Sequence, residues 1–181
     1  MGNDFKDLFG PFGWKPDRGA ENAPLSNEPE NPVNRPLNEK EVKVVAVYEA
    51  YSTLNGAPVS SQPIEIFVTL RDKSDREIRI FITRDMGLSI TLALKNEAPI
   101  RPLTHDLIKI LLDKAGMKLD RVIIDDIWDD TFYAKLVLTH NNEIIEVDSR
   151  SSDAIALALR YRAPIYAAEA VLEGSAPTEP Q

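Results

Sequence analysis

Two segments of the chain place an arginine a few residues before a hydroxyl side chain and an aspartate. They are Arg101-Pro102-Leu103-Thr104-His105-Asp106-Leu107 and Asp148-Ser149-Arg150-Ser151-Ser152-Asp153. A helix is expected to begin in each segment, with Thr104 and Ser152 as the N-cap residues. The start of a helix has unpaired backbone N–H groups and the positive end of the helix dipole, so it attracts anions. The segments therefore predict phosphate binding by Arg101, Thr104, Arg150 and Ser152.

The same segments contain candidates for acid–base chemistry and metal binding. The helix dipole disfavours a protonated imidazole at His105, so this side chain could accept a proton, although packing at the helix start is an equal alternative. Asp106, Asp148 and Asp153 could together hold Mg²⁺ or Mn²⁺ and polarise a phosphodiester. Compensation of the helix dipole is the alternative for the two helical aspartates. The predicted catalytic residues are His105, Asp106, Asp148 and Asp153.

The arginines of these segments allow two interpretations. Arg101 and Arg150 could clamp phosphate oxygens in a bidentate manner. They could equally be structural partners of the neighbouring aspartates. The adjacent pairs Asp125-Asp126 and Asp129-Asp130 resemble a metal cluster, but the second pair fits a solvated hairpin turn better.

Composition limits the kinds of cofactor and partner. The chain has 181 residues, no cysteine, two histidines and a net charge of −8. Thiolate zinc sites are excluded, and a metal site must consist mostly of oxygen ligands, which favours Mg²⁺, Mn²⁺ or Ca²⁺. No organic cofactor is predicted, because the chain lacks a glycine-rich phosphate loop. An acidic chain is unsuited to coating DNA, but a nuclease needs only a local cationic groove.

Targeting signals are also absent from the sequence pattern. There is no apolar run of the roughly 20 residues that a membrane span requires, so no membrane partner is expected. The N-terminus lacks the basic-then-apolar order of a signal peptide, which predicts a cytoplasmic protein.

The chain divides by composition into a domain with two tails. Residues 1–40 hold six of the 13 prolines and predict a disordered tail, and residues 174–181 predict a second. The domain is expected at residues 41–173. Within the first tail, the segment Phe5–Trp14 has five large apolar residues in ten. It either collapses locally or docks on a protein partner or on the domain itself.

Hydrophobic periodicity predicts an α+β domain in the order βββ-αα-βββ-α-β-α, with a mixed or antiparallel sheet of hairpins and two to four helices. The helix over residues 154–159 is apolar all round, so it should be buried. Its alanines would also allow a second copy of the chain to approach closely. The expected strands are 42–48, 64–70, 78–82, 121–127, 132–138, 144–147 and 165–167, and the expected helices are 88–95, 104–116, 154–159 and 169–173.

Four motifs occur in the order found in a known family. They are Arg101–Leu107, Thr131-Phe132-Tyr133-Ala134, Ser152–Ala158 and Ala163-Pro164-Ile165-Tyr166. From about Val42 to Leu172 the chain closely resembles the bifunctional nuclease domain family. The resemblance implies a hydrolase with DNase and RNase activity, a nucleic-acid substrate, and a homodimer with a groove for the active site.

The chain departs from the family pattern at two places. Ser151 stands where the family usually has proline, so the first turn of that helix is less constrained. The family also tends to have an acid at the start of its first helix, and here only Asp85 could replace it, from a shifted position.

The sequence thus predicts a nuclease, with a non-catalytic dimeric module as the alternative. Such a module would bind a nucleotide, nucleic acid or protein through the arginines and helix starts. An enzyme should bring His105 and at least two of the three aspartates to one exposed cleft. A binding module should bury the aspartates in arginine pairs.

Overall fold

The computed structural model describes residues 38–55 and 57–175. The two expected tails lie outside this range, apart from the residues that adjoin the domain. The segment Phe5–Trp14 also lies outside it.

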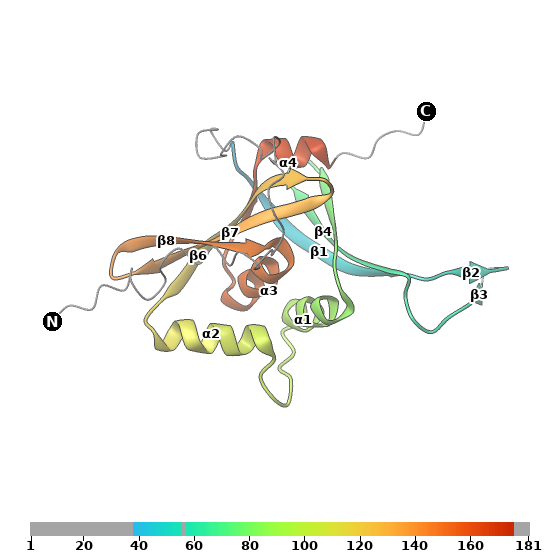
Figure 1. The fold of residues 1–181 in the computed structure, drawn as a ribbon, viewed down its shortest axis with the longest axis horizontal. Helices are drawn as coiled ribbons and strands as arrows, with labels where there is room; N and C mark the ends of the chain where they lie inside the picture. The colour runs from blue at the N-terminus through green and yellow to red at the C-terminus, as the bar shows by residue number, and fades with distance from the viewer. Residues whose placement is uncertain (1–37, 56, 176–181) are drawn as a thin grey trace, which may run out of the picture. The chain divides into compact units, whose positions relative to one another are not determined.

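A seven-stranded mixed sheet forms the centre of the domain (Figure 1), with the strand order β5-β4-β1-β9-β6-β7-β8. All neighbours pair antiparallel except β6 and β9, which are parallel. A separate ribbon, which periodicity did not predict, consists of β2 (Thr53–Leu54) and β3 (Ala57–Pro58). The sheet strands are β1 (Lys40–Ala50), β4 (Glu65–Asp72), β5 (Glu77–Phe81), β6 (Lys118–Trp128), β7 (Thr131–His140), β8 (Glu143–Arg150) and β9 (Ile165–Ala167).

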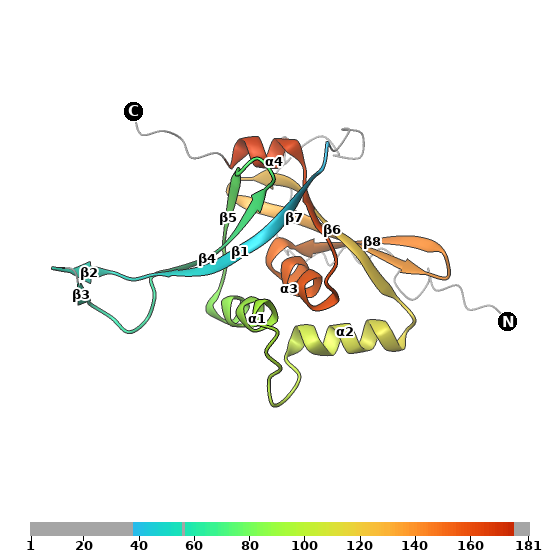
Figure 2. The ribbon, with the colours of Figure 1, turned by 180° about the vertical axis from the view of Figure 1, so that it is seen from behind.

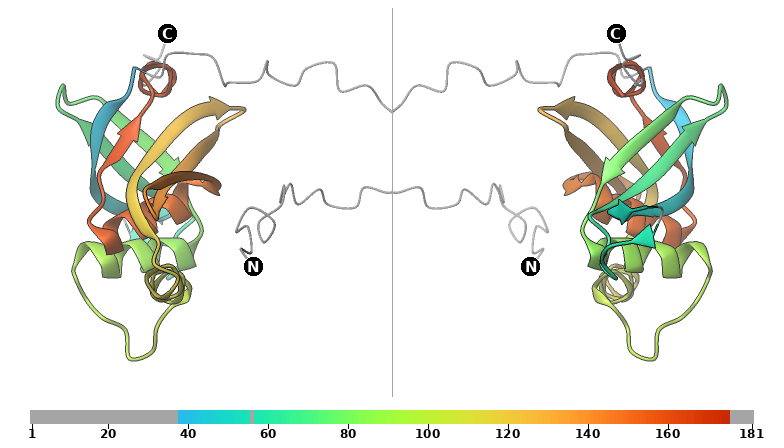
Figure 3. Two further views of the ribbon diagram at one scale, coloured as in Figure 1. Left: turned by 90° about the vertical axis from the view of Figure 1, so that its left-hand side faces the viewer. Right: turned by 90° about the vertical axis from the view of Figure 1, so that its right-hand side faces the viewer.

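Three of the four described helices, α1 (Arg84–Leu94), α2 (Thr104–Lys114) and α3 (Ser151–Tyr161), lie on the same side of the sheet. Helix α4 (Glu169–Gly174) lies at the opposite end of the domain (Figures 1 and 2). Figure 3 shows how strongly the sheet twists above α1 and α2. The α+β class and the predicted order of the main elements are confirmed. None of the helices in the described range has the length and apolar character needed to cross a membrane.

Local sequence explains where the elements around the site begin and end. Asp129 and Asp130 both have positive φ, 47° and 58°. They form the tight turn between β6 and β7, as predicted, because asparagine and aspartate tolerate this conformation. Gly116, with φ of +73°, follows the C-terminus of α2, and Met117 N–H bonds back to the Leu112 carbonyl at 2.9 Å. This glycine closes the helix as expected.

Helix α3 is the buried centre of the domain. Its residues Ala154–Ala158 are at most 3% exposed, and the helix packs against α1, α2 and strands β6, β7 and β8. The prediction of a buried helix is confirmed. The alanines are covered by elements of the same chain, so they offer no surface to a second copy, contrary to our expectation.

We predict that Ile155→Ala lowers the free energy of unfolding by about 2–5 kcal/mol, because it leaves a cavity in the core. Ile155 is fully buried, whereas Ile144 on β8 is 66% exposed. The matched control Ile144→Ala should change stability by less than about 0.5 kcal/mol. Chemical denaturation of both variants measures the difference, and equal losses would contradict the central position of α3.

Candidate functional site

The N-terminal ends of α2 and α3 meet through one hydrogen bond. His105 Nε2 lies 2.9 Å from Asp153 Oδ1. His105 is the second residue of α2 and Asp153 is the third of α3. The two segments that sequence analysis singled out are therefore brought together, although 48 residues separate this pair. We call this contact between the starts of α2 and α3 the junction. The positive ends of both helix dipoles favour negative charge there.

His105 is enclosed by its partners. It is 5% exposed, and its Nδ1 lies 3.0 Å from the hydroxyl oxygen of Ser89 on α1. An ionised carboxylate only accepts hydrogen bonds, so Nε2 carries the proton that it donates to Asp153. In the neutral ring, Nδ1 then accepts the Ser89 hydroxyl proton. Both ring nitrogens are thus engaged inside the protein, which suits a positioning role better than proton transfer to a bound substrate.

Asp153 also pairs with an exposed arginine. Arg150 Nε lies 2.6 Å from Asp153 Oδ2, and the Arg150 side chain is 72% exposed. The hydrogen bond from His105 holds the pKa of Asp153 below its ordinary value, and Arg150 adds to this against the opposing effect of burial. Asp153 therefore remains a carboxylate at neutral pH and fixes a cation that faces solvent.

Asp106 forms the second link between α2 and α3. Arg160 Nε donates to Asp106 Oδ1 at 2.6 Å, and the Leu103 backbone N–H donates to Oδ2 at 2.9 Å. Burial alone would raise the pKa of Asp106, but the bonds from Arg160 and Leu103 outweigh it and the pKa is lowered. The Arg160 side chain is only 7% exposed. Its Nη1 also bonds the backbone carbonyls of Ser89 and Ala156.

The predicted N-caps are wrong by one or two residues. Leu103 is the N-cap of α2 and Arg150 that of α3, so Thr104 is already helical and Ser152 is the second helical residue. In α2 the reason is visible, because Asp106 reaches back from the third helical position to the Leu103 N–H. In α3 the N-cap residue Arg150 makes no side-chain capping hydrogen bond.

The other predicted phosphate-binding residues differ in their access to solvent. Arg101 and Thr104 are exposed near the start of α2. Ser152 is 8% exposed, so its hydroxyl is largely covered. Arg101 and Arg150 are the cations of the two motifs that remain open to a ligand.

Asp148 does not join the other two aspartates. It pairs across the strands with Lys135, whereas the next residue, Ser149, pairs with the fully buried Ala134. Successive strand residues point to opposite faces, so Asp148 faces away from α3. The expectation that three aspartates share one cleft is not met.

The donor atoms do not fit a metal bound by these three residues. Both oxygens of Asp106 and both oxygens of Asp153 already accept hydrogen bonds. Within the part of the chain that the structure describes, no group of three or more His, Cys, Asp or Glu side chains is placed to hold a metal. Metal assistance stays a prediction, without a ligand set from Asp106, Asp148 and Asp153.

Sequence analysis missed Ser89 and Arg160. Ser89 gave no signal, because a lone serine in an amphipathic helix is usual. Arg160 did give one: it ends a run of buried apolar residues, and a charge in such a helix requires a partner. Asp85, the possible substitute for the family's acid, is exposed in the first turn of α1.

The arrangement is closer to the pattern we expected of a binding module than to that of a catalytic cleft. Asp106 and Asp153 are each paired with an arginine, and their side chains are only 24% and 25% exposed. His105 is buried beside them.

Comparison with known proteins places the domain in a family. The model of the bifunctional nuclease domain matches residues 68–179, which is more than half of the chain and includes every motif quoted above. The match begins within β4 and leaves out β1, whereas the resemblance seen in the sequence began at about Val42.

Two kinds of relative are similar in sequence. An uncharacterised protein of Mycobacterium tuberculosis (strain H37Rv) is 42% identical over 113 residues, 62% of this chain and 65% of the relative. Bifunctional nuclease 1 of Oryza sativa subsp. indica is 28% identical over 103 residues, 55% of this chain and 31% of that protein. Bifunctional nuclease 2 of Oryza sativa subsp. japonica is 29% identical over 111 residues, which are 60% of this chain and 34% of that protein. The chain thus spans about two thirds of the mycobacterial relative and about a third of the rice proteins.

We predict that the domain loses stability in acid through Asp106 and Asp153, whose pKa values are lowered by folding. An unfolded aspartate titrates near about 3.9, so the stabilisation is complete above that pH and is lost as the pH falls through the folded-state pKa values. Asp106→Asn should lower the free energy of unfolding by about 1–3 kcal/mol at pH 7. It should also reduce the slope with which stability falls at acidic pH, which we call the acid limb. Thermal unfolding across pH measures both effects.

The control for this experiment is Asp75→Asn, at a turn position where the carboxylate is 89% exposed. Asparagine tolerates the positive φ of 64° there, so the acid limb should keep the slope of the wild type. An unchanged slope in Asp106→Asn would show that the Arg160 pair does not contribute to acid sensitivity.

Proposed function

Because the chain belongs to the bifunctional nuclease domain family, we propose that it is a nuclease that hydrolyses phosphodiester bonds of DNA, RNA or both. The observation that carries this proposal is the family match over residues 68–179, which contains both helix-start motifs. The rice relatives named bifunctional nuclease support it.

The junction of α2 and α3 is where a substrate phosphate would bind. Two helix starts meet there, and each contributes partial positive charge. Arg150, 72% exposed, stands at one start, and the exposed Arg101 precedes the other. In a chain of net charge −8, such a local cationic surface is what a phosphodiester needs for binding.

The residues of the junction would then divide between binding and positioning. Arg150 would contact the phosphate, with Arg101 and Thr104 beside it. Asp153 orients Arg150 through one carboxylate oxygen, and His105 orients Asp153 through the other. Asp106 and Arg160 hold the two helices together. Assistance by Mg²⁺ or Mn²⁺ would need a ligand set other than Asp106, Asp148 and Asp153.

One observation favours a second candidate function. Both helical aspartates are committed to arginines, which leaves no free carboxylate at the junction among Asp106 and Asp153. A non-catalytic module would use the same cations to bind a nucleotide, nucleic acid or acidic protein surface without cleaving it.

We also propose that the protein is a homodimer, with α2 at the interface. Leu107, Ile110 and Leu111 on this helix are 50%, 43% and 58% exposed. A cluster of exposed apolar residues on one helix is typical of a protein interface. Other residues of the same helix, Ile108 and Leu112, already pack on the core.

For the nuclease, we predict that Arg150→Ala lowers the cleavage rate of plasmid DNA and single-stranded RNA by about tenfold or more, because a phosphate contact is lost. The matched control is Arg79→Ala on β5, whose side chain is 62% exposed and lies on the edge strand opposite β8. The control should cleave within about twofold of wild type. Equal activity of the two variants would remove Arg150 from the site.

The same assay separates the candidate functions. Protein stripped of metal is tested alone and after addition of Mg²⁺ or Mn²⁺. Cleavage that appears only with metal would support metal assistance. Binding of a labelled oligonucleotide without cleavage under every condition would favour the binding module.

For the dimer, we predict that light scattering gives twice the chain mass of 20.2 kDa. Leu111→Asp should shift this mass toward the monomer, because a charge would then be buried at the interface. Leu54→Asp, on the separate β2–β3 ribbon and 69% exposed, is the control and should remain dimeric. A monomeric wild type at all concentrations rules the proposal out.

A further inference from the structure

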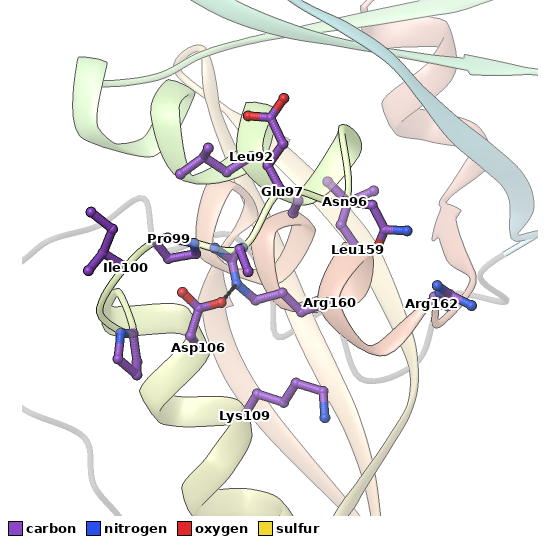
Figure 4. A pocket seen from close by; sticks show the side chains of 13 residues that line it. Leu92, Asn96, Glu97, Pro99, Ile100, Asp106, Lys109, Leu159, Arg160 and Arg162 are labelled. Atoms are coloured by element: carbon purple, nitrogen blue, oxygen red, sulfur yellow. Dashed lines mark hydrogen bonds and ion pairs between the residues drawn. The ribbon is translucent and has the colours of Figure 1, made fainter.

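A cavity of about 710 Å³ opens beside the Asp106–Arg160 pair. It is bounded by the end of α1, the loop of residues 96–102, the first turns of α2 and the end of α3. Figure 4 shows the pair in the middle of the lining, with Ile100 on one side and Arg162 on the other. Its volume is in the range of small-molecule sites. Neither His105 nor Arg150 lines it, so the cavity lies beside the phosphate-binding part of the junction and shares the Asp106–Arg160 pair with it.

One side of this cavity is cationic. Arg160 commits Nε and Nη1 to Asp106 and to backbone carbonyls, whereas its Nη2 has no hydrogen bond to any residue that the structure describes. Arg162 is exposed and likewise forms no ion pair within residues 38–55 and 57–175. Lys109 completes the set, although it also pairs with Asp113 at 2.6 Å. Two guanidinium groups with free donors are suited to a phosphate.

The other side of the cavity is apolar. Leu92, Pro99 and Ile100 line it, and Ile100 is fully exposed in the present structure. Burial of this aliphatic surface by an apolar part of a ligand would be favourable. Asn96 and Glu97 also line the cavity and offer hydrogen-bond partners. A ligand for the whole cavity would therefore have an anionic end, an apolar body and polar edge groups.

We infer that this cavity binds a nucleoside monophosphate, with the phosphate on Arg160 and Arg162 and the base against Pro99 and Ile100. The choice of a nucleotide among aromatic phosphates rests on the proposed nucleic-acid function. In that setting, the ligand is either the terminal nucleotide of a strand or a mononucleotide product of cleavage. The cavity would then hold this nucleotide next to the junction, because Asp106 belongs to both.

Arg162 provides a clean test of this inference. It follows the end of α3 with a left-handed φ of 55°, a conformation that glycine adopts without steric cost. Arg162→Gly therefore removes the cation while the helix end keeps or improves its geometry. Its melting temperature should equal or exceed that of the wild type. A loss of binding in this variant cannot then be assigned to unfolding.

The experiment is isothermal titration calorimetry of the full chain with AMP, adenosine and inorganic phosphate, each in a separate titration. AMP should bind more tightly than either fragment, because only AMP contacts both sides of the cavity. Arg162→Gly should weaken AMP by roughly tenfold or more, because a charge-assisted contact is lost. It should leave adenosine unchanged. Lys73→Ala, which removes an 82% exposed cation of the β4–β5 turn, is the charge-matched control and should bind AMP as the wild type does.

The outcomes separate this inference from the proposed nuclease. If the wild type cleaves nucleic acid but does not bind AMP at millimolar concentration, the cavity inference is wrong and the nuclease proposal stands. If AMP binds and Arg162→Gly weakens it while no nucleic acid is cleaved, the inference stands alone. Equal affinities of Arg162→Gly and wild type for AMP would overturn it.

Discussion

The domain depends on a reciprocal pairing between two helices. Asp106 near the start of α2 holds Arg160 near the end of α3, and Asp153 near the start of α3 holds His105 of α2. A largely buried charge is tolerated only when it is paired and hydrogen-bonded, and removing one partner leaves the other uncompensated. Two such links fix both the distance and the rotation between α2 and α3. No buried side-chain nitrogen or oxygen among the described residues lacks a hydrogen-bond partner, which shows how completely the pairing is satisfied.

This constraint gives the site its electrostatic character. With α2 and α3 held start to start, their dipoles add at one place on the surface. Asp153 neutralises part of that charge but also holds Arg150 toward solvent. On the far side of the Asp106–Arg160 pair, the end of α1 and the loop after it leave space for a cavity. One set of paired charges therefore separates two cationic regions of an acidic protein.

The pairing also limits how a nuclease could work on this framework. His105 has no free nitrogen, and the carboxylate oxygens of Asp106 and Asp153 are occupied. Chemistry at the junction would rely on electrostatic stabilisation by positioned cations and helix starts, with these aspartates as orienting groups. The same geometry suits binding without cleavage. Family membership favours the enzyme, whereas the committed carboxylates favour the binding module.

The sequence by itself determined the order of the main elements, the buried helix and the family. Alternation and helical spacing are local properties, and Gly116 and Asp129-Asp130 specify their turns through their own backbone preferences. The motifs also contain His105, Asp106 and Asp153, which the fold brings to the contact between α2 and α3. Only the tertiary structure decided what His105 and Asp106 do, because their partners Ser89 and Arg160 lie in α1 and at the end of α3 and are brought to them by packing. The strand pairing of β8 with β7 likewise decided that Asp148 faces away, since a single step along a strand reverses the face of a side chain.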